Sequence, residues 1–178
     1  MPEHVSQDER LLLATGRGDL EAFAELVGRH QAWAWRIAYR FLGESQYAED
    51  IVQKAFLKLL QAAPRYSPRA AFRTFFYRII TGLCLDQIRK KHPISMDSLP
   101  DAPDPGPNAT DQIIHREMAL AVRAALDKLP PNQRMAIVLR YYEDLDYRGI
   151  AEAMQISAKA VERLLSRARK RLQLLLPT

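Results

Sequence analysis

Apolar residues recur at intervals of three and four along almost the whole chain, and no stretch alternates strictly between apolar and polar side chains. The first spacing places apolar side chains on one face of an α-helix, whereas alternation is typical of a half-buried β-strand. The pattern therefore predicts an all-α protein. Four helices are expected before residue 93, the last from about 69 to 91, and four after residue 110, at about 111–129, 132–143, 146–154 and 157–175.

Polar residues at capping positions indicate where several of these helices begin. Ser6 and Glu9 have the spacing of a capping box, in which each side chain bonds to the other residue's backbone N–H. Asp19 and Ser45 precede the next two apolar stripes as expected N-caps. Gly43 follows the second stripe, where a glycine commonly ends a helix.

Between residues 93 and 107 lie five of the chain's eleven prolines, together with three aspartates. Such a segment cannot hold a helix and has little apolar surface to bury. We therefore expect two small helical domains, 1–92 and 111–178, joined by a flexible Pro/Asp-rich linker at 93–110.

Residues 147–164 have the spacing of a helix-turn-helix. A small residue, Ala151, stands where two short helices would cross, and Ser157 is placed to cap the second of them. With Val161 and Leu165 buried, the early polar residues of the second helix would face outward, toward a DNA major groove. The cations from Arg163 to Arg171 continue the same helix in positions suited to phosphates.

The segment from 65 to 78 interleaves aromatic residues with arginines, a composition that suits single-stranded nucleic acid, because rings stack on unpaired bases while cations hold the phosphates. Helical spacing alone favours Phe72, Phe76 and Ile79 as core residues. Tyr66, between two prolines, is the best candidate for a stacking platform.

The net charge of +5 is concentrated in two clusters, at 65–91 and 159–171. Clustered cations favour a polyanionic partner. The lone cysteine, Cys84, lies in an apolar pattern, which indicates a buried thiol, a reducing compartment and a cytoplasmic protein. His4, His30, His92 and His115 are scattered, without metal-ligand spacing. No catalytic motif or phosphate-binding glycine loop occurs, so we expect neither an enzyme nor a cofactor or metal.

Four blocks of the chain, in order, resemble the extracytoplasmic-function (ECF) sigma factors, small bacterial initiation factors of the sigma-70 family. They are GDLEAFAELV at 18–27, AEDIVQKAFLKL at 48–59, residues 72–91, and residues 129–171 from LPPNQR through the helix-turn-helix. The resemblance implies a factor that directs core RNA polymerase to minus-ten and minus-35 promoter elements. It also implies an anti-sigma factor as inhibitor, a protein that in the family is often membrane-anchored. This inhibitor is expected as a separate chain because nothing after Leu176 forms an inhibitory extension.

The resemblance assigns residues to three surfaces. The core-polymerase surface comprises Glu49, Asp50, Gln53, Lys54, Leu57 and Lys58. The minus-ten surface comprises Tyr66, Arg73, Phe75, Arg78, Gln87, Arg89 and Lys90. The minus-35 surface comprises Ser157, Lys159, Ala160, Glu162, Arg163, Ser166, Arg167, Arg169 and Lys170.

Four residues depart from the family pattern: Lys54, Phe75, Gly82 and Glu162, where the family often has an acid, tryptophan, asparagine and a cation. The alternative interpretation is a helix-turn-helix regulator that is not a polymerase subunit. It explains residues 146–171 but gives no role to the polar face at 49–58 or to the aromatic–arginine segment.

Overall fold

The computed structural model describes residues 5–91 and 111–176, and within them the protein is built from helices, without a strand. The all-α prediction is confirmed. The expected linker, 93–110, lies outside the described residues. The elements are α1 (Gln7–Gly16), α2 (Leu20–Leu42), α3 (Ser45–Ala62), the 3-10 turn η1 (Ala63–Arg65), α4 (Phe72–Lys91), α5 (Asp111–Asp127), α6 (Pro131–Tyr141), α7 (Tyr147–Met154) and α8 (Ala158–Leu175).

Most of the predicted helix ends are confirmed in detail. Ser6 and Glu9 form the reciprocal capping box of α1, and the Asp19 carboxylate accepts a hydrogen bond from the Ala22 N–H at the start of α2. Gly43 ends α2 in the left-handed conformation, with φ of +81°. The positive φ is what favours glycine at this position, and the Arg123 guanidinium lies against it.

Two helix starts differ from the prediction. Ser45 is the first residue of α3 rather than its cap; Glu44 is the N-cap and makes no side-chain capping bond. The helix expected from Arg69 begins at Phe72, because the Arg69 N–H bonds the Ser67 carbonyl and bends the chain there.

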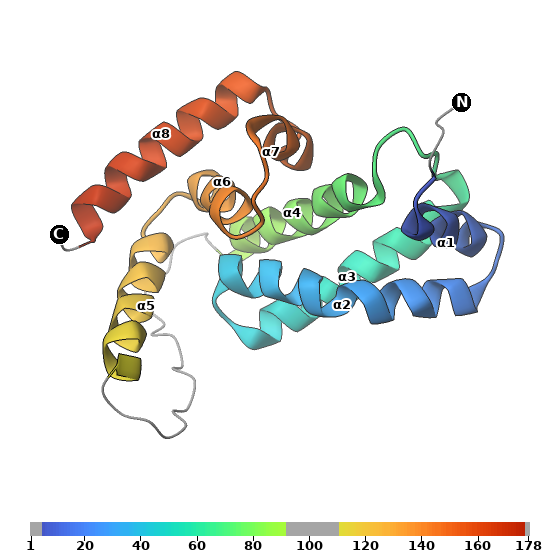
Figure 1. Cartoon of the computed structure of the whole chain (residues 1–178), viewed down its shortest axis with the longest axis horizontal. Helices are drawn as coiled ribbons and strands as arrows, with labels where there is room; N and C mark the ends of the chain where they lie inside the picture. Colours follow the sequence, from blue (N-terminus) through green and yellow to red (C-terminus); the bar gives the residue numbers. More distant parts are fainter. Residues whose placement is uncertain (1–4, 92–110, 177–178) are drawn as a thin grey trace.

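The first half of the molecule, α1–α4, is a small bundle in which α2 and α3 lie side by side with α4 packed across both (Figure 1). Its centre is aromatic: the ring of Phe76 lies 5.8 Å from that of Trp33 and 5.0 Å from that of Phe56, centroid to centroid. As expected from their spacing, Phe72 and Phe76 are core residues; Ile79 is half-buried.

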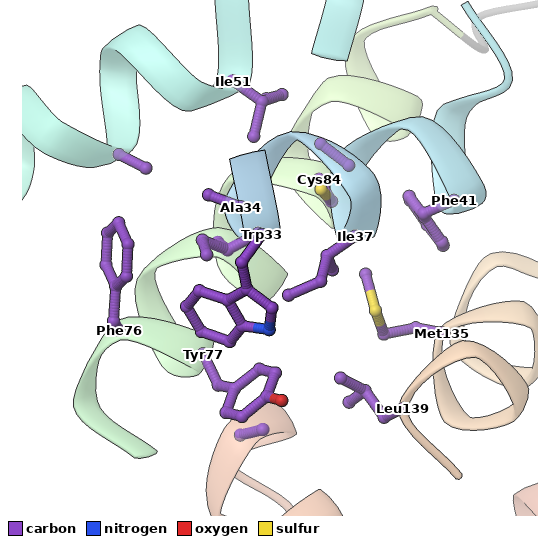
Figure 2. Close-up of a cluster of buried hydrophobic side chains, with 14 of the residues drawn as sticks. Trp33, Ala34, Ile37, Phe41, Ile51, Phe76, Tyr77, Cys84, Met135 and Leu139 are labelled. Carbon is purple, nitrogen blue, oxygen red and sulfur yellow. The ribbon is translucent and has the colours of Figure 1, made fainter. Parts of the chain in front are cut away.

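The second half, α5–α8, does not stand apart from the first. Helix α6 packs between α8 and the α2 end of the first bundle, and α7 lies along α4 (Figure 1). Met135 and Leu139 of α6 are fully buried in the same cluster as Trp33, Ile37 and Phe41 of α2 (Figure 2). The two halves therefore share one continuous hydrophobic core.

Candidate polymerase and DNA surfaces

Helix α3 separates an apolar face from a polar one because its buried residues follow helical spacing. Ala48, Ile51, Ala55, Phe56 and Leu59 are buried. All six residues assigned to the polymerase surface, Glu49, Asp50, Gln53, Lys54, Leu57 and Lys58, are exposed on the opposite side. Leu57 stands among charged neighbours with 55% of its surface exposed. Protein interfaces combine an apolar centre with a polar rim, but a single exposed leucine is common on any protein surface, so the assignment rests on the whole polar face.

A shallow groove lies beside this polar face. Glu49, Val52 and Gln53 of α3 form one wall, and Gln31 and Trp35 of α2 lie on the other. Gln31 and Trp35 were not among the residues predicted for this surface. Trp35 is half-buried and its ring is stacked on that of Tyr39, which holds the indole in place.

Helix α4 presents only part of the expected minus-ten set to solvent. Arg73, Arg78, Arg89 and Lys90 are exposed, whereas Phe75 and Gln87 are half-buried. The arginines already have neighbours. The Arg73 guanidinium lies over the rings of Trp33, at 4.8 Å, and Tyr77, at 5.8 Å. Arg89 pairs with Asp86 at 3.0 Å.

Tyr66 is not a free-standing ring. It is half-buried, its ring lies 5.3 Å from that of Phe75, and its hydroxyl donates to the Ala70 carbonyl at 3.4 Å. Burial, and secondarily the charge of Glu9, raise the pKa of Tyr66 to about 12, so the hydroxyl stays protonated at neutral pH. The loop and the start of α4 thus present a tilted pair of rings rather than a single platform.

Helices α7 and α8 form the expected helix-turn-helix. Gln155 ends α7 with a positive φ of +55°, and the Ser157 hydroxyl accepts from the Ala160 N–H at 3.1 Å. Val161 and Leu165 are fully buried, as the spacing predicted.

The outer face of α8 is polar and open. Lys159, Glu162, Arg163, Ser166, Arg167 and Lys170 are exposed. None of the six forms a hydrogen bond or ion pair with another described residue, so their polar groups are available to a partner. Ala160, also assigned to this surface, is half-buried.

Arg169 differs from its neighbours on α8. It is exposed, yet its guanidinium donates to the Leu165 carbonyl at 3.2 Å and to the Tyr147 hydroxyl at 3.1 Å. Arg169 therefore also ties α8 to α7.

Glu143, in the turn between α6 and α7, is the polar residue that sequence reasoning missed. Its side chain is 6% exposed and accepts three bonds from the first half: from the Trp33 indole N–H at 2.9 Å, the Tyr77 hydroxyl at 3.0 Å and the Arg40 guanidinium at 3.1 Å. Burial, then the charge of Glu143, raise the pKa of Tyr77 to about 12, so this hydroxyl keeps its proton to donate.

Other chemistry has little support in the described part of the chain. No group of three histidine, cysteine, aspartate or glutamate side chains there could hold a metal ion. Cys84 is fully buried, and burial raises the pKa of its thiol, which makes it unreactive. No helix within residues 5–91 and 111–176 is long and apolar enough to cross a membrane.

Comparisons with known proteins converge on one family. The model of Sigma-70 region 2 matches residues 26–93, and that of Sigma-70, region 4 matches residues 119–172. The ECF RNA polymerase sigma factor SigE of Mycolicibacterium smegmatis is 34% identical over 168 residues, which are 90% of this chain and 64% of that protein. The ECF RNA polymerase sigma factor SigW of Bacillus subtilis is 30% identical over 171 residues, 88% of this chain and 90% of SigW.

A solved structure agrees with this assignment. The structure of CnrH in complex with the cytosolic domain of CnrY superposes with a TM-score of 0.70 at 26% identity, covering 96% of this chain and 97% of that one.

Proposed function

Since the chain belongs to the ECF family of RNA polymerase sigma factors, we propose that it holds core polymerase with α3 and promoter DNA with α4 and α8. The observation that carries this proposal is the outer face of α8. A capped helix-turn-helix presents six exposed polar side chains without partners among the described residues, as a DNA-reading helix requires.

The minus-35 element is the target of α8. Lys159, Glu162, Arg163 and Ser166 occupy its first turns, where side chains reach base edges; an acid such as Glu162 can accept from a cytosine amino group. Arg167 and Lys170, farther along, are suited to phosphates. Arg169 belongs with them, although its bond to Tyr147 gives it a structural task as well.

The minus-ten element is the target of α4 and the loop before it. The Tyr66–Phe75 pair offers ring faces for unpaired bases, flanked by exposed arginines for the backbone. In this proposal residues 1–92 bind polymerase and melt the minus-ten element, residues 111–178 read the minus-35 element, and 93–110 connect them.

Control by an anti-sigma factor follows from family membership. The similar CnrH was determined bound to the cytosolic domain of a second protein. We place this chain in the cytoplasm, where polymerase acts, with its inhibitor a separate chain that a membrane could anchor. The chain has no catalytic role in this proposal.

Run-off transcription with purified core polymerase, on the promoter of the chain's own operon, tests this function. Wild type should produce a defined transcript. Asp50→Arg with Gln53→Ala should abolish both transcript and co-purification with core polymerase, because both side chains lie on the exposed face of α3 and their loss leaves the core intact.

Matched controls are Gln61→Ala on α3 and Glu117→Arg on α5, both at exposed positions outside the assigned surfaces. They should transcribe like wild type. A folded Asp50→Arg, Gln53→Ala protein that still binds polymerase would refute the docking surface. A chain that binds duplex DNA as a dimer and never yields a transcript would instead be a helix-turn-helix regulator.

A further inference from the structure

The contact between the two halves brings α7 and the turn before it against α4, the helix that carries most of the surface assigned to minus-ten DNA. The Arg78 guanidinium of α4 donates to the Glu152 carbonyl of α7 at 3.4 Å. Tyr77, on the buried side of α4, donates a hydrogen bond to Glu143 and accepts one from Arg73. Of the arginines expected to hold the DNA backbone, Arg78 therefore bonds the second half directly, and Arg73 is linked to it through Tyr77.

Glu143 is the polar centre of this contact. We define the Glu143 clasp as Trp33, Arg40, Tyr77 and Glu143, in which both carboxylate oxygens accept bonds and every donor comes from the first half. A buried charge is tolerated only with such partners, and removing one partner leaves the rest poorly satisfied. The clasp therefore favours one specific arrangement of the two halves.

A second set of contacts holds the C-terminal end of α2. Arg123 of α5 donates to the carbonyls of Tyr39 and Arg40, and Arg134 of α6 donates to the carbonyl of Phe41. The last carbonyls of a helix lack partners within the helix and carry partial negative charge, so cations stabilise this end. These bonds also exist only while the halves are together.

The arrangement in which the two halves pack together, called closed below, is incompatible with binding both promoter elements at the same time. Elements centred near positions −10 and −35 are about 25 base pairs, or roughly 85 Å, apart along duplex DNA at 3.4 Å per pair. Helix α7 touches α4, and α8, with 18 residues, is only about 27 Å long at 1.5 Å per residue. The halves must separate before both elements are bound.

We propose that the Glu143 clasp holds the free chain in a closed, self-inhibited form, and that polymerase or promoter DNA must open it. This inference rests on the proposed function, since only a promoter-binding chain has to separate its halves. It needs no second protein. The clasp lowers the fraction of chains that can bind polymerase or both promoter elements. The apparent affinity for that partner falls in proportion to this fraction.

Trp33 reports opening directly because its indole is in the clasp and 8% exposed. The chain has two tryptophans, so Trp35→Phe leaves Trp33 as the single emitter. In this background acrylamide should quench Trp33 poorly. Glu143→Gln, which keeps the shape but removes the charge, should raise quenching severalfold and increase the radius of gyration measured by X-ray scattering.

Asp144→Asn is the matched control, because it removes the same charge one residue along at an exposed site and makes no clasp contact. It should behave as wild type. Tyr77→Phe is the second variant and removes one donor while keeping the ring, so it should open the chain less than Glu143→Gln. Circular dichroism establishes that each variant is folded. Poor quenching in both folded variants would overturn the proposal, as would ready quenching in the wild type.

Transcription supplies the functional arm. At limiting polymerase Glu143→Gln should need about tenfold less core enzyme for half-maximal transcript than wild type, given the strength of hydrogen bonds to a charged group. An unchanged or higher requirement would refute self-inhibition. Because quenching and scattering use neither DNA nor polymerase, failure of the clasp is distinguishable from failure of the proposed function, in which no protein yields a transcript.

Discussion

Helices α4 and α8 carry the same signal in the sequence, a series of cations on an amphipathic helix, but the structure gives those cations different surroundings. On α4, Arg73 covers two aromatic rings and Arg78 bonds α7. On α8, Arg163, Arg167 and Lys170 are exposed and have no partner among the described residues. The sequence predicts where positive charge lies. Whether those charges are free to bind a partner depends on what packs against the helix.

The difference has a functional consequence. The outer face of α8, which we propose reads duplex DNA, is open, whereas Arg78 of the surface proposed for melted DNA is bonded to α7. Under the proposed function, α8 can contact duplex DNA as it stands, whereas Arg78 must first leave the Glu152 carbonyl of α7 before it can hold a DNA strand.

The largest expected effect tests whether the halves form one cooperative unit. Ile80 of α4 and Leu165 of α8 are both fully buried. Truncating either to alanine should lower the free energy of unfolding by about 2–5 kcal/mol, from lost apolar contacts and the cavity left behind. Urea titration should be followed by far-UV circular dichroism and, in a Trp35→Phe background, by Trp33 fluorescence.

A shared core requires that Leu165→Ala shift the Trp33 transition although Trp33 lies in the other half. The conservative pair Val52→Ala and Leu164→Ala, at half-buried positions, should cause smaller shifts. If Leu165→Ala leaves the Trp33 transition in place while helical signal is lost early, the halves unfold separately and the comparison between α4 and α8 loses its structural basis.

The apolar spacing was enough to predict most of the fold and which face of α8 is exposed. Val161 and Leu165 fix which side of that helix is buried, and the preference of Ser157 for a helix cap agrees with it. Each of these signals lies within a few residues of its effect, which is why sequence reasoning recovered them.

The contacts between the halves left no such signal. Glu143 was expected as the last residue of a helix over 132–143, but α6 ends at Tyr141, and Asp144 turns the chain with φ of +57°. Its partner Trp33 is 110 residues away. Arg123 and Arg134 likewise look like ordinary surface arginines on amphipathic helices, and only the tertiary fold brings α2 to them.

A smaller effect concerns duplex DNA and salt. Arg167→Ala with Lys170→Ala should weaken binding of a minus-35 duplex severalfold and flatten the slope of log affinity against log salt by about 1.8 units, because two phosphate contacts are lost at about 0.9 each. Arg73→Ala with Arg78→Ala removes the same charge from α4 and should change that slope little in the free chain. A salt titration of fluorescence anisotropy measures both.

Equal loss of slope in the two double variants would show that Arg73 and Arg78 already touch duplex DNA in the free chain, despite their contacts with Trp33, Tyr77 and α7. Arg169 is left unchanged in this test because its bond to Tyr147 would mix loss of phosphate contact with loosening of the helix-turn-helix.

The smallest effect concerns backbone propensity, in which α4 is the weaker of the two basic helices. Gly82 lies at an exposed position within α4, whereas α8 contains no glycine. A Cβ built on Gly82 would meet nothing within 4 Å, so Gly82→Ala should raise the free energy of unfolding by about 1 kcal/mol through helix propensity alone.

Gly28→Ala on α2, equally open, is the matched control and should give the same gain. Gly16→Ala should destabilise, since its Cβ would overlap the Ala63 carbonyl oxygen. Thermal unfolding of the three variants measures these differences. A gain for Gly28→Ala without one for Gly82→Ala would mean that α4 uses the flexibility at Gly82, and the difference between the two basic helices would then extend from their side chains to their backbones.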